Sequence, residues 1–313
     1  MTDKKFSQIP RLGYFYVISA AVLWAVSGSS AKFLFNSGVS PFQLVQLRVT
    51  IAAGLLLAWL LIRNRSLLRV ERKDILYFVL LGIIGMAGLQ FTYLFAISKI
   101  KVAAAILLQY MAPTFIAIYS VVFAREKLSL TATLAVIGAT LGCYLVVGAY
   151  NLDVLSMNRL GIIVGLISAV TFATYSIMGE HGMRRYNPWT VLFFALFVAA
   201  LSWNILHPPL EAFFHNYSLV EWGWIMYIGV LGTLVPFGLY LEGVNLIRST
   251  RASITATLEP ITAGVISYIF LGEIMDFLQI TGGILVIGSV VMLQLKQEHD
   301  DKTPAVLRSQ MDN

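Results

Sequence analysis

Ten stretches of about 20 mostly apolar residues follow one another along this chain, joined by short polar connections. An α-helix of roughly 20 residues spans the ~30 Å hydrocarbon core of a bilayer, because each residue adds 1.5 Å. Since every backbone polar group in lipid must be satisfied internally, the predicted fold class is all-α integral membrane. The expected membrane-spanning helices cover residues 13–35, 41–62, 75–97, 101–123, 129–150, 159–181, 188–206, 221–245, 250–271 and 277–295.

The composition leaves too few charges for a water-facing surface. Charged residues make up 12% of the chain and hydrophobic residues 58%, whereas a soluble domain carries about 25% charged residues. Most of the surface is therefore expected to face a lipid bilayer. The longest connection, 207–220, is too short for a separate soluble domain, and the polar tail 296–313 is predicted to be disordered.

The basic residues fall on one side of the predicted membrane. With the N-terminus in the cytoplasm, seventeen Lys and Arg residues lie in cytoplasmic segments and three in outer ones. This bias indicates that residues 1–12 and 296–313 both lie on the cytoplasmic side of the membrane. The expected membrane is the plasma (inner) membrane of a bacterium. The net charge of +6 is then a feature of topology, and no nucleic-acid partner is expected.

The two halves of the chain match when one is shifted by 147 residues. The matches are Pro41 with Pro188, Gly82 with Gly229, Gly85 with Gly232, Tyr93 with Tyr240, Pro113 with Pro260 and Glu126 with Glu273. Each half, 13–150 and 159–295, holds five predicted helices, so the second half must enter the membrane from the opposite side. We therefore predict two inverted five-helix repeats with a substrate site between them near the bilayer midplane. A duplication that only enlarged a helical bundle is the alternative.

A set of motif residues runs through both halves. It comprises Trp24, Pro41, Arg48, Pro113 and Arg125-Glu126 in the first half, and Leu258-Glu259-Pro260 and Leu271-Gly272-Glu273 in the second. In these residues the chain resembles the drug/metabolite transporter superfamily, in particular its EamA-type branch, from about residue 13 to 294. The resemblance implies ten helices in two inverted repeats and the export of small metabolites, often amino acids or amines. One departure is Met111-Ala112-Pro113, which lacks an acidic residue at the position matching Glu259, so any acidic function is asymmetric.

Motifs of hydrolases and nucleotide-driven pumps are missing from the sequence. It contains no G-x-S-x-G elbow, no G-x-x-x-x-G-K-[ST] phosphate loop and no H-E-x-x-H zinc pair. The sequence therefore predicts no enzyme, no catalytic residue, no metal site and no cofactor. Without a phosphate loop, transport would depend on the gradient of the solute or of an ion, with the proton as the candidate ion.

Three prolines are expected to kink helices at membrane depth, namely Pro113, Pro236 and Pro260. A proline lacks the N–H that would bond to the carbonyl four residues earlier. The carbonyls freed in this way belong to Gln109, Gly232 and Ala256. A freed carbonyl inside the bilayer needs a protein partner or a water-lined cavity. Because Pro113 and Pro260 match in the repeat, we expect their helices to flank one central cavity; packing kinks without a cavity are the alternative.

Two charged residues are predicted to lie inside the membrane. Glu259 is nine residues into its helix, roughly 14 Å deep, where a charge costs on the order of 2.5–3.5 kcal/mol. It could carry a proton or balance a bound amine, or it could serve only structurally, in an ion pair such as one with Arg48 or as a partner of a helix dipole. Arg48 lies roughly 10 Å below the outer boundary, close enough in depth for such a pair. Its planar guanidinium could instead bind a substrate carboxylate.

Polar and aromatic side chains complete the expected cavity. The candidates beside Glu259 and Arg48 are Gln109, Trp24, Tyr93, Tyr110, Tyr175 and Tyr240. Aromatic rings suit a cationic amine, although membrane helices are rich in such residues in any case. Two G-x-x-x-G pairs, Gly138/Gly142 and Gly161/Gly165, permit close helix contacts between the halves or in a homodimer.

The sequence as a whole predicts a secondary transporter that exports a small metabolite, such as an amino acid or amine, by alternating access. An importer with the same fold is one alternative, and a non-transporting membrane sensor or assembly protein is another. The identity of the solute, the direction of transport and the coupling ion are left open by the sequence.

Overall fold

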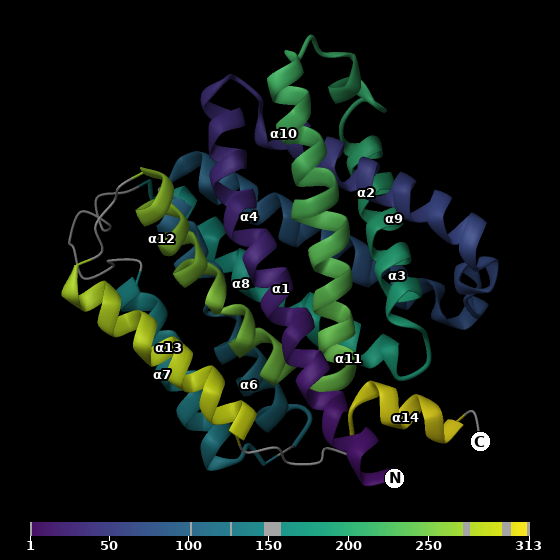
Figure 1. The fold of residues 1–313 in the computed structure, drawn as a ribbon. Helices are drawn as coiled ribbons and strands as arrows, with labels where there is room; N and C mark the ends of the chain where they lie inside the picture. The colour runs from purple at the N-terminus through teal and green to yellow at the C-terminus, as the bar shows by residue number, and fades with distance from the viewer. Residues whose placement is uncertain are drawn as a thin grey trace.

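The computed structural model describes residues 2–100, 102–125, 127–146, 158–271, 276–295 and 302–311, and their regular structure is helical (Figure 1). The seven stretches that are long and apolar enough to cross a membrane are Arg11–Asn36, Pro41–Arg63, Arg72–Lys99, Ala104–Val122, Arg159–Met183, Pro188–Leu206 and Leu219–Ala256. Two shorter apolar helices cover Leu130–Leu145 and Phe277–Leu293. The chain is thus a multi-pass, all-helical membrane protein over the part that the structure describes.

The first half contains α1 (Thr2–Asn36), α2 (Pro41–Arg63), η1 (Arg65–Leu68), η2 (Arg72–Asp74), α3 (Ile75–Leu80), η3 (Leu81–Ala87), α4 (Gly88–Lys99), α5 (Val102–Gln109), α6 (Ala112–Val122) and α7 (Leu130–Val146). The second half contains α8 (Arg159–Met183), α9 (Pro188–Leu206), η5 (Glu211–Phe214), α10 (Leu219–Gly229), η6 (Val230–Leu234), α11 (Val235–Ala256), α12 (Leu258–Leu271) and α13 (Phe277–Leu295). A last helix, α14, covers Pro304–Met311. The motif residues Glu126, Gly272 and Glu273 lie outside the described residues.

Two of the expected spans are each divided into two helices by a short turn close to a proline. The span predicted over 101–123 is divided into α5 and α6 by a turn at Tyr110 and Met111, and Pro113 is the second residue of α6. The span predicted over 250–271 is divided at Thr257, where α11 ends and α12 begins. α5 ends at Gln109 and α11 at Ala256, which are matching positions of the repeat. Each break comes just before a proline, because proline fits the first turn of a helix but not its interior.

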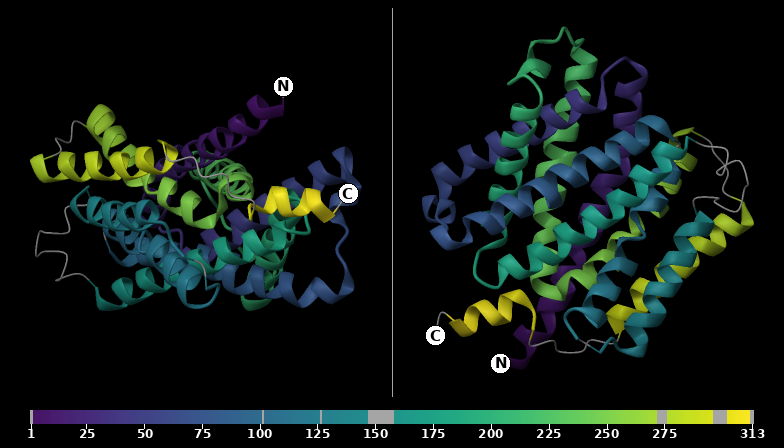
Figure 2. Two further views of the ribbon diagram at one scale, coloured as in Figure 1. Left: turned by 90° about the horizontal axis from the view of Figure 1, so that it is seen from below. Right: turned by 180° about the vertical axis from the view of Figure 1, so that it is seen from behind.

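Helices at matching positions pack in matching ways. α1 lies along α11, and α4 lies along α8, as Figures 1 and 2 show. The close approaches are matched as well: Gly82 of η3 packs against Val198, and Gly229, which ends α10, packs so closely against Ile51 that an added β-carbon would lie 2.9 Å from its side chain. Shifting Gly82 and Ile51 by 147 residues gives Gly229 and Val198. Both η3 and η6 are π-helical, and each contains or adjoins these glycines.

The contact at Gly82 leads to a stability prediction. A methyl group at this position would overlap the Val198 side chain and lie 3.2 Å from the Ala195 carbonyl oxygen. Gly82→Ala is therefore expected to destabilise the fold by about 1–3 kcal/mol, the usual cost of overpacking, and to lower the melting temperature of the purified protein. Gly54→Ala is the matched control, because nothing lies within 4 Å of its added methyl group. Equal melting temperatures for the two variants would contradict this packing.

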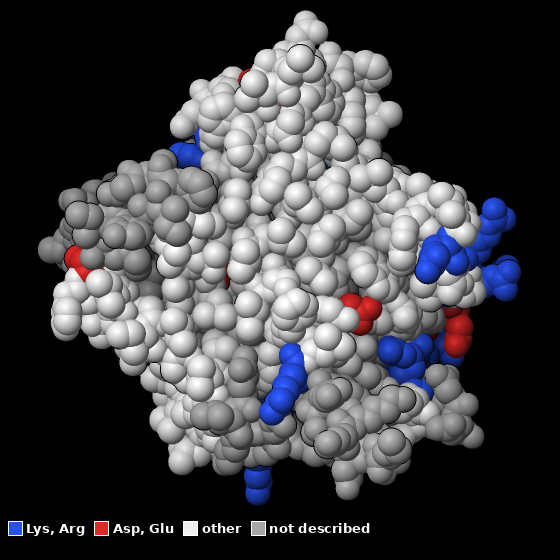
Figure 3. Space-filling model, viewed as in Figure 1, with Lys and Arg blue, Asp and Glu red and all other residues white. Residues whose placement is uncertain are grey.

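The outer surface of the helices is largely apolar. Large hydrophobic side chains such as Ile118, Leu134, Ile163 and Ile284 are each about half exposed, and contiguous exposure of this kind is rare in soluble proteins. Figure 3 shows a face on which most described atoms belong to uncharged residues, with most Lys and Arg toward the right-hand and lower edges and a few at the upper left. This surface fits a lipid environment around the middle of the molecule.

The two ends of the molecule differ. Both chain ends lie together near α14, and the connection between α9 and α10 lies at the opposite end (Figure 1). We call these the terminal end and the loop end. The tail is not disordered throughout, as the sequence suggested, because Arg308 of α14 donates hydrogen bonds to the carbonyl oxygens of Met183 (2.6 Å) and Tyr186 (3.0 Å). These carbonyls at the end of α8 lack helical partners, and a cation there is stabilised by the helix dipole.

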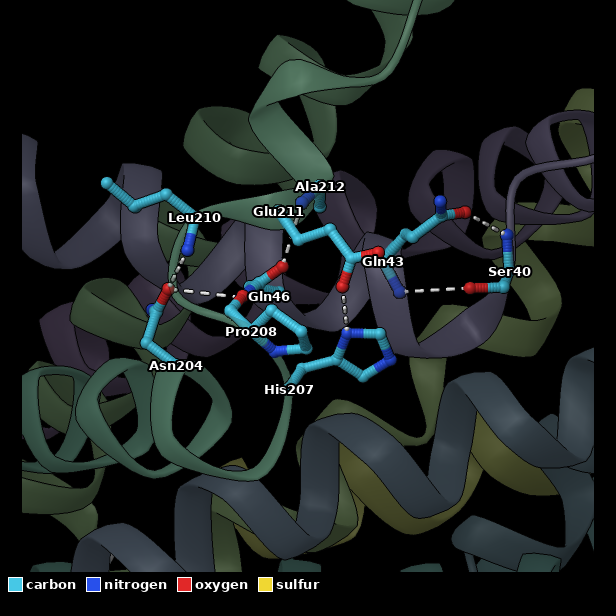
Figure 4. Close-up of polar contacts among 9 residues, drawn as sticks. All are labelled: Ser40, Gln43, Gln46, Asn204, His207, Pro208, Leu210, Glu211 and Ala212. Carbon is cyan, nitrogen blue, oxygen red and sulfur yellow. Dashed lines mark hydrogen bonds and ion pairs between the residues drawn. The ribbon is translucent and has the colours of Figure 1, made fainter.

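A polar network holds the connection at the loop end (Figure 4). Gln46, a fully buried residue of α2, donates to Asn204 (3.1 Å) and to the Pro208 carbonyl (3.0 Å), and accepts from the Ala212 N–H (3.1 Å). Asn204 in turn accepts from the Leu210 N–H (2.8 Å). The connection is thereby fixed over the end of α2 that leads to Arg48.

Candidate functional site

A small cavity lies between the two halves. It is lined by Trp24 and Ser27 of α1, Arg48 of α2, Leu89, Gln90 and Tyr93 of α4, Gln109 of α5, Phe172 of α8, Phe237 of α11 and Glu259 of α12. The free space is about 20 Å³, which is enough for about one water molecule. This conformation is therefore closed around the site, and a metabolite could enter only after the helices separate.

Glu259 lies in this cavity at the start of α12, just after the break at Thr257. Its side chain is only 2% exposed. One carboxylate oxygen accepts a hydrogen bond from the Tyr110 hydroxyl at 2.7 Å, and the other a longer one from Tyr93 at 3.5 Å. A carboxylate at a helix N-terminus is stabilised by the helix dipole, so the break that precedes Pro260 places Glu259 where a buried charge is tolerated.

Arg48 lies in the same cavity but does not pair with Glu259. Its Nε donates to the Thr233 hydroxyl (2.8 Å) and its Nη2 to the Gly232 carbonyl (3.0 Å), both in η6. The ion pair considered from depth alone is thus not formed between these two described residues. Pro236 has no N–H to donate to the Gly232 carbonyl, and Arg48 donates to this carbonyl instead of pairing with Glu259.

Three buried polar atoms at the cavity have no hydrogen-bond partner within the described part of the chain. They are the indole Nε1 of Trp24, the Nη1 of Arg48 and the Oε1 of Gln109. A buried polar group without a partner costs about 1–3 kcal/mol, and native proteins leave few of them. Two donors and one acceptor around one cavity, beside a carboxylate, are groups that a polar ligand could satisfy.

The remaining aromatic candidates lie behind the cavity rather than in its lining. Tyr240 is hydrogen-bonded to Ser176 at 2.8 Å, and its ring centroid is 5.6 Å from that of Trp24. Tyr175 packs against Phe237 with a centroid separation of 5.5 Å. Both tyrosines are fully buried. They belong to an aromatic cluster that includes Trp24, Phe172 and Phe237 of the cavity wall.

Of the eight residues proposed from sequence, the structure places five in the cavity lining: Trp24, Arg48, Tyr93, Gln109 and Glu259. Tyr110 holds the carboxylate of Glu259 instead of lining the cavity. Reasoning from aromatic and charged residues missed Ser27, Leu89, Gln90, Phe172 and Phe237. A buried amide such as Gln90 inside an apolar stretch was the signal that could have been used. Among the described residues, no group of three or more His, Cys, Asp or Glu side chains could hold a metal ion.

Comparison with known proteins decides the family. The model of the EamA-like transporter family matches residues 11–148 and again residues 159–295. The chain belongs to the EamA-like transporter family. This confirms the resemblance seen in the motif residues, and the repeated match shows that both halves carry the family pattern.

Curated relatives of this EamA-like protein are transporters by name. An uncharacterized inner membrane transporter, YicL, of Salmonella typhimurium is 27% identical over 91% of this chain and 96% of its own length. An uncharacterized transporter of Archaeoglobus fulgidus is 28% identical over 90% and 96%. The pseudopaline exporter CntI of Pseudomonas aeruginosa is 26% identical over 77% and 82%. A crystal structure with 21% identity covers 90% of this chain and 96% of its own, with a TM-score of 0.71, and supports the fold.

Two polar contacts, each between helices of one half, lie toward opposite ends of this EamA-like protein. Toward the loop end, Lys32 of α1 donates to the carbonyl oxygens of Ile97 (2.8 Å) and Ile100 (3.4 Å), where α4 ends. Toward the terminal end, Glu180 of α8 binds Arg248 of α11 at 2.9 Å. Lys32 matches Gly179 in the repeat, next to Glu180. The two contacts therefore arise at nearly equivalent positions of the two halves. Sequence reasoning did not single out Glu180, because it lies near the predicted end of its span.

Proposed function

We propose that this protein is a secondary transporter that moves a small metabolite, an amino acid or amine, by alternating access. The observation that carries the proposal is the closed cavity between the halves, in which a buried carboxylate and a buried guanidinium lie without pairing to each other. Charged groups at membrane depth are costly and generally mark a solute or ion pathway.

The proposed arrangement is ten membrane-spanning helices in two inverted five-helix repeats, over residues 13–150 and 159–295. Support comes from the matching breaks at Gln109 and Ala256, the matching π-helical segments, and the matched approaches at Gly82 and Gly229. In such a plan, opening toward either side is a nearly symmetric change. We propose that the contacts of Lys32 and Glu180, each between two helices of one half and one toward each end, break and form as the two sides open in turn.

The groups at the cavity favour a zwitterionic solute. Arg48 Nη1 and Trp24 Nε1 are donors suited to a carboxylate, and guanidinium binds that group in a planar fork. Glu259 and the Gln109 oxygen are acceptors suited to an ammonium group. A simple amine would satisfy only the second set. We therefore propose an α-amino acid or a related zwitterion as the solute, with amines as the weaker alternative.

We propose export as the direction. The support is the relative that is named an exporter, CntI. An importer with the same cavity would make the same contacts, and direction is decided by the gradient to which transport is coupled. Accumulation of the solute in the medium of producing cells, and not in the cells, would distinguish export from import.

The proposed function is tested with the purified full-length chain. A thermal-shift screen against amino acids and their decarboxylated amines should show a higher melting temperature with one or more zwitterions, because a ligand that binds only the folded state stabilises it. The same solutes should exchange across the membrane of proteoliposomes preloaded with them. Binding without any exchange would favour a sensor, and the absence of both binding and exchange would overturn the proposal.

The orientation is a separate prediction. The seventeen-to-three distribution of Lys and Arg places the terminal end in the cytoplasm of a bacterial inner membrane. Reporter fusions after Leu68 and after Lys296 should be active in the cytoplasm, and a fusion after Phe214 should be active outside. A cytoplasmic signal from the Phe214 fusion would reverse the assignment.

A further inference from the structure

A second, larger cavity lies at the terminal end. Its volume is about 310 Å³, and its lining includes Ser120 of α6, Glu180, His181 and Arg184 at the end of α8, and Arg248 and Ser249 of α11. Ligand cavities in proteins begin at about 300 Å³, so this inner vestibule has room for a small metabolite, whereas the central cavity in this conformation does not.

The wall of the vestibule contains a preformed binding site for a carboxylate, which Glu180 occupies. Its two oxygens accept from Arg248 Nε (2.9 Å), the Ser249 N–H (2.7 Å) and the Ser249 hydroxyl (2.6 Å). Glu180 is buried and sits at the N-terminal end of the last turns of α11. A cation and a free helix N-terminus together form a general binding site for anions.

The backbone at this site is strained. Arg248 has φ 67° and ψ 162° inside α11, a conformation found almost only in glycine. Such strain is maintained where surrounding contacts determine it, and it gathers at ligand clamps and switches. Here Glu180 contacts both residues of the bend, Arg248 through Nε and Ser249 through its N–H and hydroxyl, so that a change at Glu180 acts directly on the strained segment.

A second guanidinium group lines the vestibule beside the preformed site. The Nε of Arg184 is buried and has no hydrogen-bond partner within the described residues, although the residue lines the vestibule. Its neighbour Arg185, by contrast, is exposed and lies 3.5 Å from Asp74. Among the described lining residues there is one carboxylate, Glu180, against two guanidinium groups. The vestibule is therefore suited to an incoming anion.

We propose that the inner vestibule is a second binding site, specific for a carboxylate group, in which Arg184 makes the first contact and the ligand then replaces Glu180 on Arg248 and Ser249. Given the transport function proposed above, on which this role rests, the ligand is the carboxylate end of the solute entering from the terminal end. Replacement of Glu180 would free the strained bend and couple solute entry to the opening of that end.

The first test asks whether the site accepts an external carboxylate, using purified full-length protein and acetate as the probe. Glu180→Ala should lower the melting temperature, because it strands the donors of Arg248 and Ser249. Acetate should raise the melting temperature of Glu180→Ala by several degrees, and sodium chloride at equal ionic strength should not. Adding Arg184→Gln should increase the acetate concentration needed on the order of tenfold. No response of folded Glu180→Ala to acetate would overturn the proposal.

The second test does not require Glu180 to be changed. A single reporter cysteine, Ala124→Cys, is placed in the vestibule lining after Cys143→Ala removes the native thiol. The rates of its reaction with an anionic and a cationic methanethiosulfonate of similar size are then compared. Arg184→Gln should lower the ratio of the anionic to the cationic reaction rate on the order of tenfold. In the reporter protein that keeps Arg184, acetate should slow the reaction with the anionic reagent.

The matched control in this second test is Arg185→Gln, which removes a neighbouring positive charge outside the lining and should leave the ratio unchanged. Equal ratios for Arg184→Gln and the parent protein would show that Arg184 does not attract anions into the vestibule. Neither test measures transport. A failure here therefore leaves the proposed transport function standing, and a failure of the proteoliposome assay leaves the carboxylate site standing.

Discussion

Glu259→Gln is expected to lower transport, measured as kcat/KM in proteoliposomes, by about 100-fold or more while the protein remains folded. The substitution keeps the shape of the side chain and its acceptor for the Tyr110 hydroxyl, but it removes the negative charge. The pair in question is the carboxylate of Glu259 with the ammonium group of the proposed solute. Loss of one partner of such a buried charge pair costs about 3–5 kcal/mol, and every 1.4 kcal/mol is a factor of ten. If Glu259 also carries the coupling proton, the remaining transport should no longer depend on an imposed pH gradient.

Glu221→Gln provides the matched control for this experiment. Glu221 lies in the capping box at the start of α10, where it accepts a hydrogen bond from the Ser218 N–H at 2.7 Å. Glu221 is not among the residues that line the central cavity. Its substitution should therefore leave kcat/KM within twofold of the value for the unsubstituted protein. Normal transport by Glu259→Gln at every pH would exclude both the amine role and the proton role of Glu259.

Arg48→Met is expected to abolish the preference for zwitterions over amines. In the unsubstituted protein the best-binding amino acid should raise the melting temperature more than its decarboxylated amine, because only the amino acid can reach Arg48 Nη1. Loss of the carboxylate contact should weaken amino-acid binding by about 100-fold and leave amine binding nearly unchanged. The readout is the dissociation constant for each member of the pair.

A second variant separates recognition from packing. Arg48 also satisfies the Gly232 carbonyl and the Thr233 hydroxyl, so Arg48→Met carries a stability cost of about 1–3 kcal/mol. Arg48→Lys keeps a charge at this depth but lacks the planar fork. We expect Arg48→Lys to fold and still to lose most of the selectivity. Unchanged selectivity in Arg48→Lys would mean that Arg48 serves only to hold η6.

Counting residues along the helices brought Glu259 and Arg48 close to one another but did not identify the partner of Arg48. Both residues were expected at similar levels of the bilayer, and both line one cavity. The partner of Arg48 depends on which carbonyl is freed near it in space. That carbonyl belongs to Gly232, 184 residues away in the chain, and its availability follows from Pro236 and the π-helical turn before it. A count of residues from the membrane boundary contains no information about this contact.

Helix breaks show a similar limit. Prolines at 113, 236 and 260 predicted kinks, and close to two of them a short turn divides the helix, at Tyr110 and at Thr257. Local chemistry decides that the helix is interrupted, since proline cannot continue the hydrogen-bond pattern. Whether the chain bends or starts a new helix depends on the neighbours that satisfy the freed groups.

The sequence by itself determined the properties that depend on composition and period: a helical membrane protein, the EamA-like family, the duplicated halves and the two buried charges. These follow because apolar length, proline positions and a 147-residue shift are visible in the linear chain. The tertiary structure alone decided the closed state of the cavity, the contact of Arg48 with η6, and the carboxylate site at Glu180, Arg248 and Ser249. Each of these depends on groups far apart in the chain meeting at one point, as Glu180 meets the strained bend at Arg248 and Ser249.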